Sequence, residues 1–155
     1  MAIPHPLDNL DISVATLEPE WVVTVDTPLG GAEALRAALG RELPLAQGPY
    51  DNCMFVRETG YQTFRALDGS HAGAEGTVQK TPAAQIVFSL PCDIELLRHA
   101  FAVIFTHHVN EEPTIRVVEA WGSRSKLLDD KDNPHRYWNR EDADALHGDA
   151  IEGEN

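Results

Sequence analysis

The stretch that most constrains this chain runs from Thr106 to Trp121, where a helical pattern gives way to a strand pattern. Before it, apolar residues recur at helical spacing between Ile94 and Phe105. After Pro113 the apolar residues alternate, which places Ile115, Val117 and Trp121 on one side of a strand. Proline also excludes the residue before it from the helical region. A helix must therefore end and a strand must begin within a few residues.

This junction carries two imidazoles and two carboxylates, from His107, His108, Glu111 and Glu112. Imidazole with carboxylate suits zinc, copper, nickel or iron, and a thiolate from Cys53 would favour zinc or copper(I). The candidate metal ligands are therefore His107, His108, Glu112 and Cys53, with a divalent transition metal, zinc or copper foremost, as the cofactor. Adjacent histidines on an extended backbone point to opposite sides, so a single site would use one of the two.

The same residues also permit an enzyme, and this hypothesis stays open beside the first. A glutamate in a partly buried turn would have its pKa raised toward neutrality and act as a general base. Glu111, Glu112 and His108 would then be the catalytic residues of a hydrolase or lyase, and Arg65 would hold a small anionic substrate. Cys53 beside a histidine is an alternative nucleophile, although no motif of a known covalent mechanism is present.

The charge and composition restrict the partners and the compartment. The chain has 155 residues and a formal net charge of −13. Such a charge repels nucleic acid and anionic membrane surfaces. The N-terminus shows no signal-peptide pattern, and no apolar stretch approaches the roughly 18–20 residues of a membrane span. Cys53 and Cys92 form neither a disulfide framework nor a Cys-x-x-Cys metal motif. We therefore expect a cytoplasmic protein that binds neither nucleic acid nor membrane.

The acidic charge is concentrated at the two ends. Residues 1–20 hold four acids and no Lys or Arg, and residues 125–155 hold nine acids and four bases. Because residues 1–20 lack sustained periodicity, we expect them to form an arm. A folded domain is expected at 21–124, followed by an acidic extension at 125–155. Tyr137 and Trp138 favour order to about residue 140, since disordered tails seldom carry such aromatics.

Between these ends the pattern alternates between strand and helix. Strands are expected over 21–26, 50–58, 61–66, 84–90 and 115–121, and helices over 28–39 and 94–106, with proline at the first position of the first helix. The first helix would have Thr27 as its N-cap and Gly40 as its stop, and Asp93 would cap the second. Thr59-Gly60 is expected to form a hairpin turn, and the glycine-rich stretch 67–76 a flexible loop.

Right-handed crossovers between these elements predict an α+β, ferredoxin-like βαββαβ antiparallel sheet with two helices on one face. The other face of that sheet also carries apolar residues. Unless something covers that face, it favours oligomerisation.

Several separated motifs give the chain a resemblance to a known family. They are the run Gly48 to Phe55 (Gly-Pro-Tyr-Asp-Asn-Cys-Met-Phe), Thr63-Phe64-Arg65, the glycines of 67–76, and Glu111-Glu112-Pro113 after His108. In this order they resemble the small domain inserted in Nif-three-like proteins, which also occurs as a stand-alone protein. The resemblance covers approximately residues 21–121.

The resemblance implies a ferredoxin-like fold akin to PII signalling proteins and CutA divalent-cation-tolerance proteins. Those proteins usually form trimers through their sheets, so a homo-oligomer is expected, a trimer rather than a dimer. The dinuclear metal centre of the larger Nif-three-like proteins is not implied, because its ligands lie outside the matching domain.

The chain departs from the family pattern His-Pro-Tyr-Glu-Glu-Pro, since it reads His108-Val109-Asn110-Glu111-Glu112-Pro113. The changes are drift if this turn only shapes the backbone, and they indicate a different ligand if it lines a pocket. We therefore expect a divalent metal or a small molecule to bind near this turn, with Tyr50, Arg65 and His71 as candidate ligand-binding residues. A small enzyme and a PII-like sensor module remain the alternatives.

Overall fold

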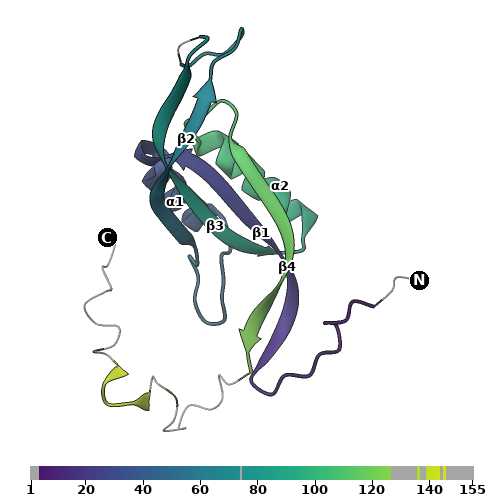
Figure 1. Ribbon diagram of the computed structural model, residues 1–155. Helices are drawn as coiled ribbons and strands as arrows, with labels where there is room; N and C mark the ends of the chain where they lie inside the picture. The colour runs from purple at the N-terminus through teal and green to yellow at the C-terminus, as the bar shows by residue number, and fades with distance from the viewer. Residues whose placement is uncertain (1–3, 74, 127–135, 137–138, 144, 146–155) are drawn as a thin grey trace. The chain divides into compact units, whose positions relative to one another are not determined.

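The fold is an antiparallel sheet with two helices on one face (Figure 1). The computed structural model describes residues 4–73, 75–126, 136, 139–143 and 145. Its elements are β1 (Ala15–Pro28), α1 (Leu29–Glu42), β2 (Phe55–Arg65), β3 (Val78–Pro91), α2 (Ile94–His107) and β4 (Thr114–Ser125). The strand order is β2-β3-β1-β4, and β1 and β2 both run antiparallel to β3. This arrangement confirms the predicted ferredoxin-like βαββαβ fold.

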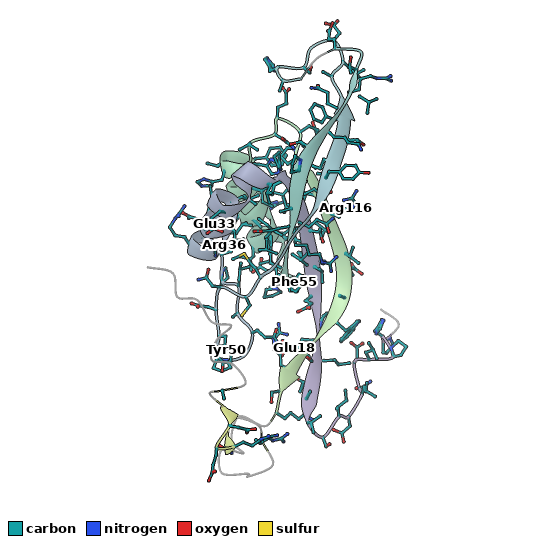
Figure 2. All side chains as sticks on the ribbon, turned by 60° about the vertical axis from the view of Figure 1, so that its left-hand side comes forward. Glu18, Glu33, Arg36, Tyr50, Phe55 and Arg116 are labelled. Carbon is teal, nitrogen blue, oxygen red and sulfur yellow. The ribbon has the colours of Figure 1, made fainter. Side chains whose placement is uncertain are left out.

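Alternation along the central strands separates the two faces of the sheet. The apolar side chains of one face are buried beneath the helices, in a core that includes Val23, Val25, Leu35, Leu39, Ile86, Phe88, Leu90 and Ile104. The residues between them on β1 and β3, such as Thr24, Asp26 and Gln85, point to the opposite face. In Figure 2, the helix residues Glu33 and Arg36 lie on one side of the sheet and Arg116 lies on the other.

Residues 55–65 form one bulged strand, so the predicted hairpin turn at Thr59-Gly60 is wrong. β2 pairs with β3 on both sides of that dipeptide, since Arg57 pairs with Gln85 and Gly60 pairs with Ala83. Two residues of β2 therefore stand opposite the single residue Ala84, which is the arrangement of a β-bulge. The glycine-rich stretch instead connects β2 to β3, and three of its glycines have positive φ.

Helix α1 begins at Leu29, one residue after the predicted start, and is longer than predicted at its C-terminal end. It continues through Gly40 to Glu42, so the predicted stop at Gly40 is wrong. Thr27 is not its N-cap either, because the Thr27 side chain is fully buried and its hydroxyl donates to the carbonyl of Pro28 (3.3 Å). At Gly40 the helix and the α1–β2 loop approach each other closely, because a Cβ there would lie 1.8 Å from Oδ1 of Asn52. The α1–β2 loop packs against the helix at this point.

Helix α2 begins where the sequence predicts. The Asp93 side chain caps it by accepting the backbone N–H groups of Glu95 (2.9 Å) and Leu96 (3.3 Å). The helix ends at His107, one residue beyond the predicted boundary. No helix among the described residues is long and apolar enough to cross a membrane.

The chain divides into two compact units, Leu17–Gly122 and a second made of Met1–Thr16 with Ser123–Asn155. In the second unit, the backbone N–H of Lys126 donates to the carbonyl of Val14 (3.1 Å), and its ammonium donates to the carbonyl of Ile12 (2.7 Å). Strand β1 starts at Ala15, within the stretch predicted to be an arm. The aromatic residues Tyr137 and Trp138 lie outside the described residues.

A pair of leucines on α1 tests the packing of the core. Leu35 is fully buried, so Leu35→Ala removes apolar contacts and should lower the free energy of unfolding by about 2–5 kcal/mol. Leu29 is 40 % exposed on the same helix, and Leu29→Ala should cost clearly less. Urea unfolding followed by circular dichroism measures both variants. Equal losses of stability would contradict the core as described.

Candidate functional site

The turn between α2 and β4 is fixed to strand β1 through His108. Nδ1 of His108 accepts the backbone N–H of Asn110 (2.9 Å), and Nε2 lies 2.8 Å from the carbonyl oxygen of Asp26. Because Nδ1 accepts, the ring proton is on Nε2 and is donated to Asp26. Both ring nitrogens are thus used within the protein. His108 positions the turn and, in this arrangement, offers no lone pair to a metal ion.

Glu111 of the same turn makes a two-point contact with the β2–β3 loop. Its Oε1 accepts the backbone N–H of His71 (2.8 Å), and its Oε2 lies 2.7 Å from Nδ1 of the His71 ring. The hydrogen bond from the ring, followed by the one from the His71 backbone, holds the pKa of Glu111 below its usual value. This direction is opposite to the raised pKa expected for a general base in this turn, and the catalytic role of Glu111 stays a prediction.

The other predicted metal ligands do not join this contact. His107 and Glu112 are exposed. The backbone N–H of Cys53 donates to the carbonyl of Leu45 (2.9 Å). Across residues 4–73 and 75–126 and the few described residues beyond them, no group of three or more His, Cys, Asp or Glu could hold a metal ion. Within the described part of a single chain, the side chains of His107, His108, Glu112 and Cys53 therefore do not form a common metal site. This ligand set stays a prediction.

Helix α1 separates the two halves of the predicted site. Cys53 is tied to Leu45, just beyond the end of α1, whereas His108 contacts Asp26, just before its start. A helix of 14 residues is about 21 Å long, so Cys53 and His108 lie near opposite ends of this helix. The thiol of Cys53 instead lies 3.5 Å from the carbonyl of Asp51.

The three predicted ligand-binding residues are also dispersed. Tyr50 is 71 % exposed in the α1–β2 loop, and Figure 2 shows it well away from Arg116. Arg65 is the last residue of β2 and pairs with Val78 beside the β2–β3 loop. His71 lies in that loop, against Glu111. The structure therefore brings His71 against Glu111, two candidate residues that the sequence predicted in separate roles.

The sequence did not predict a groove of about 220 Å³ beside the β2 bulge. It is lined by Asp26, Arg57, Gly60, Tyr61, Gln62, Ala83, Ala84 and Gln85. These residues come from β1, β2 and β3, which are neighbours in the sheet. Gly60 has no side chain to fill the space next to the bulge, so the backbone itself forms part of the floor.

The charged groups of this groove differ in how they are paired. Asp26 accepts from the amide of Gln85 (2.8 Å) and lies 3.2 Å from Nη1 of Arg116, so its charge is compensated. Arg57 is exposed, with its guanidinium 5.4 Å above the ring centre of Phe55. No carboxylate in the described part of the chain pairs with it. The groove can therefore present one guanidinium to a ligand.

Asp26, Arg57 and Gln85 were not candidates from sequence because polar residues at alternating strand positions are usually solvated. One signal was available. Asp26 is the only charged residue of the strand predicted over 21–26.

These features define the class of domain. A βαββαβ sheet with strand order β2-β3-β1-β4, and with both helices on one face, is a ferredoxin-like domain. The loop that carries His71 connects β2 to β3, and the turn that carries Glu111 connects α2 to β4. The resemblance seen in the sequence therefore agrees with the fold.

Solved structures show the same likeness. A Bacillus cereus protein related to NIF3 is 26 % identical, with a TM-score of 0.57 over 76 % of this chain and 30 % of that one. CutA1 from Oryza sativa is 18 % identical, with a TM-score of 0.50 over 68 % of this chain and 83 % of that one. The divalent ion tolerance protein CutA1 from Ehrlichia chaffeensis is 14 % identical, with a TM-score of 0.51 over 71 % and 89 %.

These likenesses confirm the predicted resemblance at the level of the domain. The matched region is less than a third of the length of the NIF3-related protein. No protein-family model and no curated protein matches the chain.

His108→Ala tests whether the imidazole positions the turn. It removes the partners of the Asp26 carbonyl and the Asn110 N–H, and should lower the free energy of unfolding by about 1–3 kcal/mol. His107→Ala is the matched control, because His107 is exposed at the end of the same helix and should change stability by less than about 0.5 kcal/mol. Urea titration measures both. If the two variants lose the same stability, the contact with Asp26 is not formed in solution.

The contact between Glu111 and His71 should depend on pH. Because folding lowers the pKa of Glu111, its contribution to stability is present above the ordinary carboxyl value and is lost as pH falls through the lowered one. NMR titration of the Glu111 carboxyl carbon in metal-free buffer follows this directly. His71→Ala should return the pKa of Glu111 toward its ordinary value. An unchanged titration in that variant would rule His71 out as the cause.

Proposed function

We propose that this chain is the subunit of a cytoplasmic homo-oligomer that binds a small anionic molecule in the groove beside the β2 bulge. The observation that carries the proposal is the charge pattern of the lining. Asp26 is already matched by Arg116 and Gln85, which leaves the guanidinium of Arg57 for a ligand. A guanidinium binds a carboxylate or phosphate through two parallel hydrogen bonds.

The rest of the lining suits the remainder of such a molecule. Gln62 and Gln85 supply amide groups, and Tyr61, Ala83 and Ala84 supply apolar surface. Binding sites commonly combine an apolar lining with a few polar groups that fix orientation. In a chain with a net charge of −13 an anionic ligand needs a local cation, and Arg57 supplies one in the groove.

The proposal of a homo-oligomer rests on the sheet face that carries the groove. Phe55 on β2 is 61 % exposed and Val118 on β4 is 59 % exposed. Alternation places them on the same face as Arg57 and Arg116. Contact with further copies would cover these apolar side chains and leave the groove close to the interface. A trimer is the assembly we propose, by analogy with the CutA and PII proteins.

A divalent metal ion is the second candidate ligand, and two observations favour it. CutA1 of Ehrlichia chaffeensis is named a divalent ion tolerance protein. In this chain, His71 and Glu111 place an imidazole against a carboxylate, the ligand types that zinc and copper take. By contrast, the lowered pKa of Glu111 does not favour the enzyme alternative.

The groove is tested by a matched pair of arginine variants. In thermal-shift measurements, small carboxylates and phosphates that bind should raise the melting temperature of the protein. Arg57→Ala should weaken the binding of such a ligand about tenfold or more, because a hydrogen bond to a charged group is lost. Arg65→Ala, an exposed arginine at the far end of the same strand, should leave it unchanged.

Two results would contradict the proposal. One is that none of these anions shifts the melting temperature, and the other is that the two arginine variants weaken binding equally. Light scattering on the same samples gives the assembly state, and a monomer at micromolar concentration would rule out the proposed oligomer.

A further inference from the structure

Three polar residues of the groove form one row across the sheet. Gln85 of β3 stands in the middle, because it pairs with Arg57 of β2 on one side and with Asp26 of β1 on the other. Residues that pair directly across antiparallel strands point to the same face, with their Cβ atoms about 5 Å apart. The row therefore carries a guanidinium at one end, an amide in the middle and a carboxylate at the other end. All three residues line the groove.

Small residues leave space beside this row. Ala83 lies two positions before Gln85 on β3, and so on the same face, and it pairs with Gly60 of β2. A Cβ added at Gly60 would come within 4 Å of the carbonyl oxygen of Ala83 alone, at 3.6 Å. The groove, at about 220 Å³, is smaller than the roughly 300–1,000 Å³ of sites for drug-sized molecules. It therefore suits a small molecule that lies along the row.

The groups next to Arg57 in the row can accept hydrogen bonds. Gln85 donates its amide N–H to Oδ1 of Asp26 (2.8 Å), so its amide oxygen remains an acceptor. Oδ2 of Asp26 accepts from Nη1 of Arg116 (3.2 Å). An ionised carboxylate has about four lone-pair sites, so Asp26 can accept further hydrogen bonds. A ligand whose anionic end is held by Arg57 would therefore meet acceptors at its other end.

We propose that the groove binds a small zwitterion, whose carboxylate pairs with Arg57 and whose ammonium donates to Asp26 and Gln85. This inference rests on the proposed function and names the class of its ligand. An ammonium has three donors and no acceptor, so it matches the groups at that end of the row. A second anionic group there would instead be repelled by the carboxylate of Asp26.

The width of the row indicates which amino acids fit best. Neighbouring strands lie about 4.7–4.9 Å apart, so the two ends of the row, on β2 and β1, are roughly 10 Å apart. A ligand that spans this distance needs its two charges separated by a short chain. We therefore expect β-alanine and 4-aminobutyrate to bind more tightly than glycine, whose charges are closer together.

The test is an NMR titration of the isotope-labelled full chain with pairs of compounds that differ only in the amine. β-Alanine is compared with propionate, and 4-aminobutyrate with butyrate. The side-chain amide signals of Gln85 and the Nε–H signal of Arg57 report binding at the row. Each amino acid should bind about tenfold or more tightly than its partner acid, because a hydrogen bond between charged groups is added.

Two variants separate the charge of Asp26 from its structural role. Asp26→Asn removes the negative charge and should abolish the preference for the amine, while propionate still binds. Arg116→Ala is the matched control, because it breaks the same ion pair but leaves the carboxylate in place, so the preference should persist. Arg57→Ala should weaken the binding of β-alanine and of propionate alike.

The outcomes distinguish this inference from the proposed function. Equal affinities for β-alanine and propionate in the unaltered protein would overturn the zwitterion and leave the anion site standing. Loss of the preference in Arg116→Ala as well would assign it to the ion pair, and the contact between the ammonium and Asp26 would be refuted. If no binding depends on Arg57, both proposals fail. The comparison of paired ligands uses the unaltered chain, so it does not depend on whether a variant folds.

Discussion

The arrangement of this domain depends on Asp26, near the C-terminal end of β1. Its backbone carbonyl accepts from His108 on the turn after α2, and its carboxylate accepts from Gln85 of β3 and Arg116 of β4. One residue therefore ties three strands and a turn together. Its side chain is only 18 % exposed, so leaving this carboxylate without partners would cost more than losing a surface ion pair.

The tie at Asp26 also determines where the more distant parts of the site lie. By fixing His108, it fixes the turn in which Glu111 stands three residues later. Glu111 in turn holds His71, which lies 40 residues earlier in the sequence. The position of the β2–β3 loop thus depends on a chain of contacts that begins in the sheet. A loop rich in glycine needs such contacts, because its backbone has little conformational preference of its own.

The sequence predicted the elements of the fold more completely than it predicted which residues of the site lie together. Asp93 and the spacing after it located α2, because capping and apolar periodicity are local signals. The β2 bulge was mistaken for a turn, since Thr-Gly fits either and only pairing with β3 distinguishes them. The His71–Glu111 contact could not be predicted as a pair, because it joins two loops whose meeting depends on tertiary structure. The groove depended on that bulge and was missed with it.

The substitutions in the turn can now be given a physical role. Val109 stands where the family pattern has proline, and it packs so closely on α1 that a Cβ at Gly31 would lie 2.9 Å from its side chain. Asn110 contributes its backbone N–H to His108 and no side chain to the groove. Both residues therefore shape the turn. This agrees with the interpretation that the two substitutions are drift, in which the backbone geometry of the turn is kept. Glu111 is the residue of the turn whose carboxylate contacts the neighbouring β2–β3 loop.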